Sequence, residues 1–267
     1  MRWKMALAIV AGAISLSGAG CATDLPEAQR LLALQQLPDA LRAVDHCLSL
    51  EPKRTPALLL KGNLLYLLSR DPEAMAMFEQ LLEREPGLAD ARYALGRIYY
   101  ANGRHPQAVE QFSAMVKADP GHYRAWDNLG LALEGAGRID DAVKAHLQSI
   151  ALVSQAHPDY DWAYANLAEL LLKQDENRRA FDLAVEAATR NPARARNAYL
   201  AGKALTRLNQ WTPAERWLRR SAELDLQYPE PHYLLGQLLI RAGKREAADE
   251  ELTHFQKLRA AEPEKRR

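Results

Sequence analysis

Residues 89–122 read ADARYALGRIYYANGRHPQAVEQFSAMVKADPGH, and this stretch decides the fold because its pattern recurs at a fixed step. Three residue types repeat at a step of 34 residues. Glycine does so at residues 62, 96 and 130 and again at 202 and 236; alanine at 74, 108 and 142 and again at 214 and 248; and proline at 52, 86 and 120. Self-similarity at a period of this length indicates stacked copies of one small structural unit.

The composition indicates that the units are helical. Ala, Leu, Glu, Gln and Arg dominate, and alternating runs of β-branched residues are absent, so we predict an all-α fold. Lys plus Arg number 35 against 34 for Asp plus Glu, which gives no electrostatic case for a nucleic-acid partner.

The unit resembles the tetratricopeptide repeat, whose copies are helical hairpins of 34 residues. The residues that carry the resemblance are Leu95, Gly96, Tyr99, Ala108, Phe112 and Pro120 in one unit and Trp126, Leu129, Gly130, Leu133 and Ala142 in the next. The resemblance implies an all-α solenoid of about seven hairpins that forms a right-handed superhelix over residues 21–262. The units are predicted at residues 21–54, 55–88, 89–122, 123–156, 161–194, 195–228 and 229–262.

Physical reasons support this division of the chain. A small residue at the eighth and twentieth positions lets the two helices of a hairpin approach closely. A left-handed turn after the first helix favours glycine or asparagine, and the residues found there include Gly103, Gly137, Gly243 and Asn209. Residues 157–160 interrupt the period, and we expect them to lengthen the preceding helix or the loop that follows it.

The first residues have the pattern of a secretory signal. Arg2 and Lys4 precede an uncharged apolar stretch over residues 5–19, so residues 1–20 are predicted to be a signal peptide. Cys21 stands where bacterial lipoproteins carry their lipidated cysteine, although Gly18 replaces the usual leucine of that motif. We expect Cys21 to be lipidated; cleavage by ordinary signal peptidase after Gly20 or Ala22 is the alternative.

That alternative leaves two destinations open. A lipidated chain with Ala22 after the cysteine resembles outer-membrane lipoproteins that face the periplasm, whereas an unlipidated chain is a soluble periplasmic protein.

The second cysteine, Cys47, has the spacing of a small buried core residue, with a free reactive thiol as the other interpretation; a disulfide is impossible once Cys21 is lipidated. Residues 263–267 are expected to form a charged tail.

No stretch carries the chemistry of an enzyme. The glycines and paired aspartates of WDNLGLALEGAGRIDDA, residues 126–142, lack the lysine and hydroxyl that a phosphate-binding loop needs. The seven histidines have no spacing typical of metal ligands. We therefore predict a non-catalytic protein with no cofactor, no metal and no small-molecule substrate.

The resemblance places partner binding on the first helix of each hairpin, which lines the concave groove in the family. Asparagine amides there hold a peptide backbone, tyrosines add contact area, and basic side chains recognise carboxylates. The predicted partner-binding residues are Tyr93, Arg97, Arg124, Asn128, Asn166, Lys173, Arg196, Tyr199, Lys203, Arg207 and Tyr233.

These observations predict a protein–protein interaction scaffold, membrane-anchored in the periplasm, that binds a protein or peptide along its groove. The resemblance extends to exported lipoproteins of envelope assembly and secretion systems. A soluble periplasmic adaptor that serves an enzyme system, such as cytochrome maturation, cell-wall hydrolysis or polysaccharide export, is the alternative. A spacer that binds through its convex face is a third.

Overall fold

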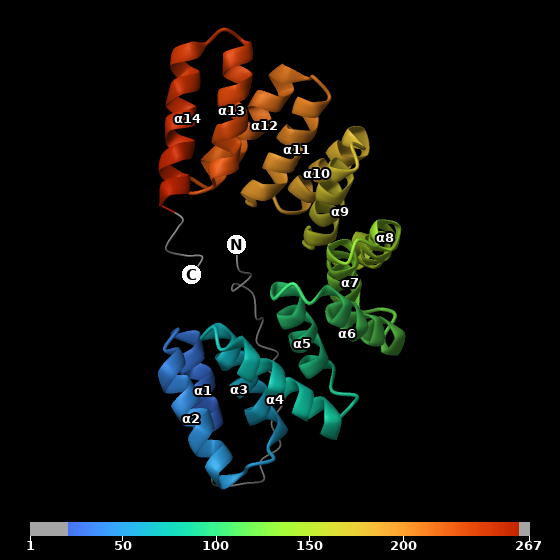
Figure 1. The fold of residues 1–267 in the computed structure, drawn as a ribbon, viewed down its shortest axis with the longest axis vertical. Helices are drawn as coiled ribbons and strands as arrows, with labels where there is room; N and C mark the ends of the chain where they lie inside the picture. Colours follow the sequence, from blue (N-terminus) through green and yellow to red (C-terminus); the bar gives the residue numbers. More distant parts are fainter. Residues whose placement is uncertain (1–20, 262–267) are drawn as a thin grey trace. The chain divides into compact units, whose positions relative to one another are not determined.

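The computed structural model describes residues 21–261, and every regular element within them is a helix (Figure 1). The predicted signal peptide and charged tail lie outside the described residues. The helices are α1 (Asp24–Ala33), α2 (Leu37–Leu50), α3 (Thr55–Leu67), α4 (Asp71–Arg84), α5 (Ala89–Ala101), α6 (His105–Ala118), α7 (Tyr123–Gly135), α8 (Ile139–Ala156), α9 (Trp162–Lys173), α10 (Asn177–Arg190), α11 (Ala195–Arg207), α12 (Trp211–Leu224), α13 (Pro229–Arg241) and α14 (Arg245–Ala260).

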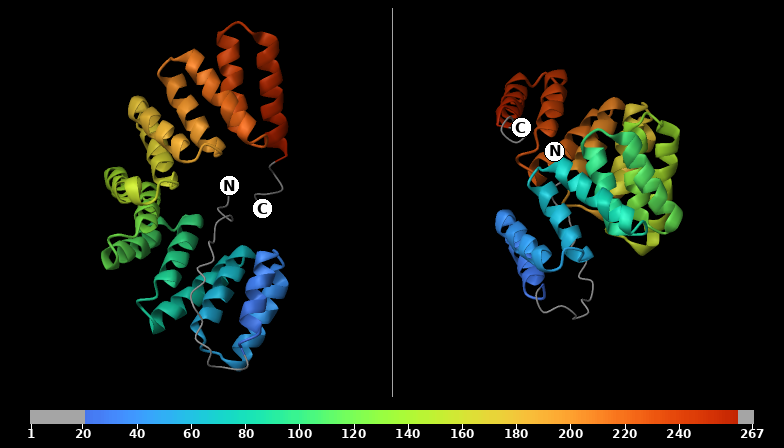
Figure 2. Two further views of the ribbon diagram at one scale, coloured as in Figure 1. Left: turned by 180° about the vertical axis from the view of Figure 1, so that it is seen from behind. Right: turned by 60° about the horizontal axis from the view of Figure 1, so that its bottom comes forward.

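These fourteen helices pair as the seven predicted hairpins, so the all-α repeat fold is confirmed. The described residues divide into two compact units, an N-terminal unit that ends at Gly137 and a C-terminal unit that begins at Arg138. Within each unit, helices that follow one another pack side by side, as Figures 1 and 2 show. The right-handed superhelix is a property of the whole array and stays a prediction.

First helices of neighbouring hairpins also touch one another. In the N-terminal unit α3 contacts α5 and α5 contacts α7; in the C-terminal unit α9 contacts α11 and α11 contacts α13. No pair of second helices has comparable contacts within residues 21–261. The first helices therefore line the inner side of each unit, and we call this surface the first-helix face.

Small residues allow each hairpin to close tightly. A Cβ atom added to Gly96 would lie 2.9 Å from the ring of Phe112, and one added to Gly62 would lie 2.6 Å from the ring of Phe78. Such distances are below van der Waals contact, so a glycine is needed where the facing side chain is a phenylalanine. The predicted role of the eighth position is confirmed.

The facing residue is smaller wherever the eighth position is alanine. Ala28 stands sixteen residues before Val44, and Ala168 stands sixteen residues before Ala184, whereas the same spacing joins Gly96 to Phe112. All four residues of the two alanine pairs are fully buried. A smaller facing residue thus accompanies the methyl group of alanine, because a close-packed interior does not tolerate a clash.

The turn after every first helix contains one residue with positive φ. The glycines predicted for this turn have φ of 71° at Gly103, 77° at Gly137 and 74° at Gly243, and Asn209 has 59°. The remaining three turns place Gln35, Ser69 and Asp175 in the same conformation. The turn geometry is therefore common to all seven hairpins, including those whose residues do not favour it.

The four extra residues lengthen the fourth hairpin's second helix. Helix α8 has 18 residues, while the other second helices have 14 or 16. The expectation for residues 157–160 is thus confirmed. Among the described residues, no helix has both the length and the apolarity to cross a membrane.

Candidate partner-binding surface

The glycine-rich stretch at residues 126–142 is a helical corner. Gly135 ends α7, Gly137 forms the left-handed turn, and Asp140 and Asp141 begin α8. Arg138 donates hydrogen bonds to Asp141 and lowers the pKa of that carboxyl group. Residues 21–261 hold no group of three or more His, Cys, Asp or Glu that could bind a metal ion.

In the N-terminal unit, the structure brings together four predicted site residues on α5 and α7. The Nδ2 atom of Asn128 donates to the Arg124 carbonyl oxygen at 2.7 Å and to the Tyr93 hydroxyl at 3.1 Å. The Arg97 guanidinium lies 5.9 Å from the centre of the Tyr93 ring. Burial raises the pKa of Tyr93, so its hydroxyl stays protonated. Both amide protons of Asn128 are thus used to hold its neighbours in place.

In the C-terminal unit, Arg196 bridges α11 and α9. Its Nη2 atom donates to Asn166 Oδ1 at 3.0 Å and to Glu169 Oε2 at 2.6 Å. Desolvation alone would raise the pKa of Glu169, but the charge and hydrogen bond of Arg196, together with Lys173 and Lys203, hold it below its ordinary value. Asn166 is buried and already accepts this hydrogen bond, so its amide oxygen is engaged within the protein.

The middle of the same face carries an aromatic and basic group. The Lys203 ammonium lies 5.6 Å from the centre of the Tyr199 ring, which meets the Tyr228 ring edge-on at 5.3 Å. Desolvation lowers the pKa of Lys203 and raises that of Tyr199 to about 12. On α13, the ring of Tyr233 packs against Phe255 with 42% of the residue exposed. These side chains lie on helices that contact each other.

Arg207 has a different environment from the one predicted for it. Its Nη1 atom donates to the Leu172 carbonyl oxygen, near the end of α9, and to Asp175 Oδ1 at 3.1 Å. A cation at a helix C-terminus stabilises the unpaired carbonyl groups there. The structure therefore gives Arg207 a capping contact between α9 and α11, while Lys173 stands beside it at the end of α9.

Sequence reasoning missed a polar network beneath this face. Asp161, which is 1% exposed, precedes α9 and accepts hydrogen bonds from Arg194 Nε at 2.5 Å and Asn197 Nδ2 at 2.7 Å. Asn197 Nδ2 also donates to the Ala187 carbonyl oxygen at 2.9 Å. The network joins α9, α10 and α11. The signal in the sequence is a carboxylate and a carboxamide 36 residues apart, at the first position of one repeat and the third position of the next.

A second missed residue, Arg190, holds the insertion. Its guanidinium donates to the carbonyl oxygens of Val153, Ser154, His157 and Pro158 at 3.2–3.5 Å and stacks on the Tyr164 ring at 4.4 Å. It thereby caps the last turn of α8. No local sequence pattern indicates this capping contact, because Arg190 lies more than thirty residues along the chain from those carbonyl groups.

The two cysteines form a disulfide between the segment preceding α1 and helix α2. Cys21 and Cys47 are fully buried, and their Cα atoms are 4.6 Å apart, within the usual range for such bonds. The prediction that Cys47 is buried is confirmed, but its interpretation as an unpaired residue is wrong in this structure. A single sulfur cannot carry both a lipid thioether and a disulfide.

Comparisons with known proteins agree with this architecture. A sequence model of the tetratricopeptide repeat matches residues 25–89, 73–123 and 93–161, just over half of the chain. No curated protein matches the chain as a relative.

Three solved structures illustrate the similarity of fold. A tetratricopeptide repeat protein from Parabacteroides merdae ATCC 43184 is 11% identical with a TM-score of 0.71, over 90% of this chain and 94% of that one. Pseudomonas aeruginosa PilF is 19% identical with a TM-score of 0.65, over 77% and 96%. MamA from Desulfovibrio magneticus RS-1 is 20% identical with a TM-score of 0.56, over 66% and 97%. At these identities the similarity shows the fold alone.

Proposed function

Because the chain belongs to the tetratricopeptide repeat family, whose members bind other proteins, we propose that it is a non-catalytic scaffold that holds a partner polypeptide on the first-helix face of its C-terminal unit. Seven of the eleven predicted site residues belong to the first helices of that unit, α9, α11 and α13. The smaller set on α5 and α7 forms a second, independent surface of the N-terminal unit.

The observation that carries the proposal is the chemistry of α11 and α13. Lys203 is partly desolvated beside the Tyr199 ring, and the charges of Glu169 and Glu230 act on it without a direct ion pair within residues 21–261. Tyr233 and Ile240 lie two turns apart on α13, with 42% and 53% of each residue exposed. A face that combines exposed apolar side chains with a cation that no direct ion pair engages suits a peptide that carries both apolar and acidic groups.

Peptide selection tests this surface and does not require the partner to be identified first. Peptides selected from a phage-displayed random library on the wild-type protein are expected to lose at least tenfold in affinity for the Lys203→Ala/Tyr233→Ala double variant. Arg245→Ala, an exposed change on α14, is the matched control. Selected peptides that bind all three proteins equally would place the binding surface elsewhere, including on the second helices that a spacer would use.

We also propose that the scaffold is exported and anchored through Cys21 at the outer membrane, facing the periplasm, where it serves an envelope assembly or secretion system. The signal-like residues 1–20 and the position of Cys21 support this proposal. The Cys21 sulfur carries either the lipid or the disulfide. In a lipidated chain the thiol of Cys47 is therefore free.

The Cys21–Cys47 disulfide favours the second candidate, a soluble periplasmic adaptor. Labelling cells with radioactive palmitate distinguishes the two. The anchored form predicts label that Cys21→Ser removes and Cys47→Ser retains, together with one reactive thiol per denatured chain. An unlabelled wild-type chain whose thiols react only after reduction would establish the soluble form.

A further inference from the structure

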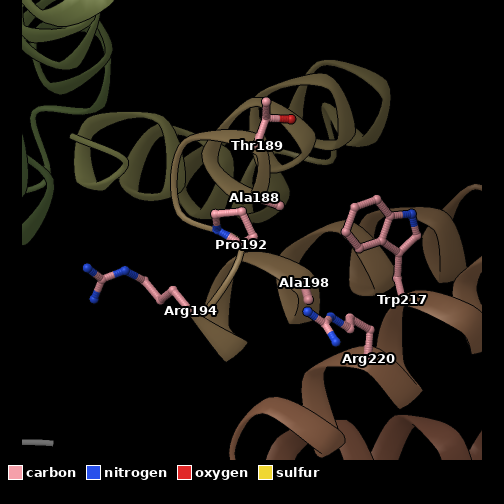
Figure 3. Close-up of a pocket in the computed structure, with 7 residues that line it drawn as sticks. All are labelled: Ala188, Thr189, Pro192, Arg194, Ala198, Trp217 and Arg220. Atoms are coloured by element: carbon pink, nitrogen blue, oxygen red, sulfur yellow. The ribbon is translucent and has the colours of Figure 1, made fainter. Parts of the chain in front are cut away.

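A small pocket opens on the C-terminal unit, and none of the residues predicted to bind a partner lines it. It lies between the end of α10, the turn that follows it and the middle of α12 (Figure 3). Its volume is about 180 Å³. Pockets for cofactors and drug-sized molecules begin at roughly 300 Å³, so this space is suited to one large side chain.

Most of the pocket wall is apolar. The apolar part consists of the Trp217 indole, the Pro192 ring and the side chains of Ala188 and Ala198, and Thr189 and two arginines complete the lining. Trp217 is half-buried because part of its ring packs against the core around Leu218 and Leu235. The indole is therefore held in place before any ligand arrives, which lowers the entropic cost of binding.

Two arginines line the pocket, and they differ in how their charge is used. Arg194 is occupied: it donates to Asp161 at 2.5 Å and lies 3.9 Å from the centre of the Trp162 ring. Arg220 is exposed and makes no hydrogen bond or ion pair within residues 21–261. Figure 3 shows its guanidinium beside Ala198, whereas Arg194 points away from the other labelled side chains.

Further positive charge lies on the same helix. Arg216, one turn before Arg220 on α12, is also exposed and has no ion-pair partner among the described residues. Their neighbour Arg219 is neutralised by Glu215 at 2.8 Å. Residues 178–220 contain ten Lys and Arg against three Asp and Glu, whereas the whole chain is nearly neutral, with 35 Lys and Arg against 34 Asp and Glu.

We propose that this pocket is a second partner-binding site, which accepts one apolar side chain of a polypeptide whose adjacent carboxylates pair with Arg220 and Arg216. Tryptophan and arginine are the residues that contribute most to protein interfaces, and a guanidinium binds a carboxylate through two parallel hydrogen bonds. Two free arginines supply too little charge for stable binding to a nucleic-acid backbone, so an acidic peptide fits better. The site lies on α12 and is independent of the first-helix face.

Nuclear magnetic resonance titration measures such binding even when it is weak. The probe is the peptide Glu-Glu-Phe-Glu-Glu, and the readout is the indole N–H resonance of Trp217, assigned from the spectrum of Trp217→Phe. We expect that resonance to shift on titration, Arg220→Ala to weaken binding at least tenfold, and Arg219→Ala to change it less than twofold. Because the Trp217 resonance reports on this pocket alone, Lys203→Ala/Tyr233→Ala, which alters the first-helix face, is expected to leave the titration of that resonance unchanged.

Charge reversal gives a result that misfolding cannot produce. Arg216→Glu/Arg220→Glu should prefer Lys-Lys-Phe-Lys-Lys to the acidic probe. The proposal is overturned if the Trp217 resonance does not move at millimolar peptide, if Glu-Glu-Gly-Glu-Glu binds as tightly as the phenylalanine peptide, or if Arg219→Ala and Arg220→Ala weaken binding equally. A thymidine oligonucleotide that binds more tightly than the peptide, with loss in Arg220→Ala, would assign the site to nucleic acid instead.

Discussion

Asp161 and Asn197 share a buried hydrogen bond of 2.7 Å, formed between the residue that precedes α9 and the third residue of α11. The same carboxylate is paired with Arg194. Successive hairpins of this unit are thus joined by a charged group that has no access to water, and removing it leaves two donors without an acceptor.

We therefore expect Asp161→Ala to lower the free energy of unfolding by about 2–4 kcal/mol, because it strands the Arg194 and Asn197 donors. Denaturation followed by circular dichroism measures the change. Asp159→Ala, an exposed aspartate two residues earlier in the chain, is the control and should stay within about 0.5 kcal/mol of the wild type. Equal effects of the two variants would show that the buried network contributes nothing to stability.

Gly103→Ala isolates the cost of the left-handed turn. A Cβ atom added at Gly103 or at Gly87 would meet nothing within 4 Å, so neither substitution causes a clash. The two positions differ in backbone conformation, because Gly103 has a positive φ and Gly87 does not. We expect Gly103→Ala to destabilise the protein by about 1 kcal/mol and Gly87→Ala to be neutral or slightly stabilising. Thermal denaturation of both variants checks this, and a neutral Gly103→Ala would contradict it.

Gly96→Ala should cost about 1–3 kcal/mol despite the better helix propensity of alanine, since the added methyl group meets the Phe112 ring at 2.9 Å. Phe112→Val should recover part of that loss, as the pairing of Ala28 with Val44 indicates. The measurement is a double-mutant cycle from denaturant unfolding. Phe78→Val, which faces Gly62, is the control, and its effect should simply add to that of Gly96→Ala.

Glu169→Gln should reveal a pH-dependent contribution to stability. The pKa of Glu169 is lowered in the folded protein, so its stabilising contribution is present above its ordinary pKa and is lost as the pH falls through the lower folded value. The side chain is 39% exposed, which reduces the expected difference to about 1 kcal/mol at pH 7. Unfolding of both proteins from pH 7 to pH 3 should show the difference vanish at the acid end. A difference that is constant with pH, or one that Glu223→Gln reproduces, would refute this account.

Most of the architecture follows from local chemistry in the sequence. The spacing of Gly96, Ala108 and Pro120 predicts the hairpins, because close helix packing and helix termination need those residue types at those positions. Helix α6 ends at Ala118, two residues before that proline. The left-handed turn at Asn209 was also predictable, because asparagine adopts that conformation readily. The same conformation at Gln35 was not predictable, because glutamine has no preference for it.

The candidate site was predictable only in part. The sequence places Tyr199, Lys203 and Tyr233 on first helices, and in the structure those helices, α11 and α13, contact each other. The sequence alone could not indicate that Asn166 is already bound by Arg196, or that Arg207 caps α9. Both contacts join residues that are thirty or more positions apart in the chain.

The sequence by itself determined the repeat, its helices and the type of residue at each turn, because these depend on interactions within one hairpin. Tertiary structure alone decided which polar side chains are used internally and which remain for a partner. Arg194 and Arg220 illustrate the difference: both are arginines beside the same pocket, but only one meets a buried carboxylate. That distinction arises from the packing of α9 against α11, which no local pattern encodes.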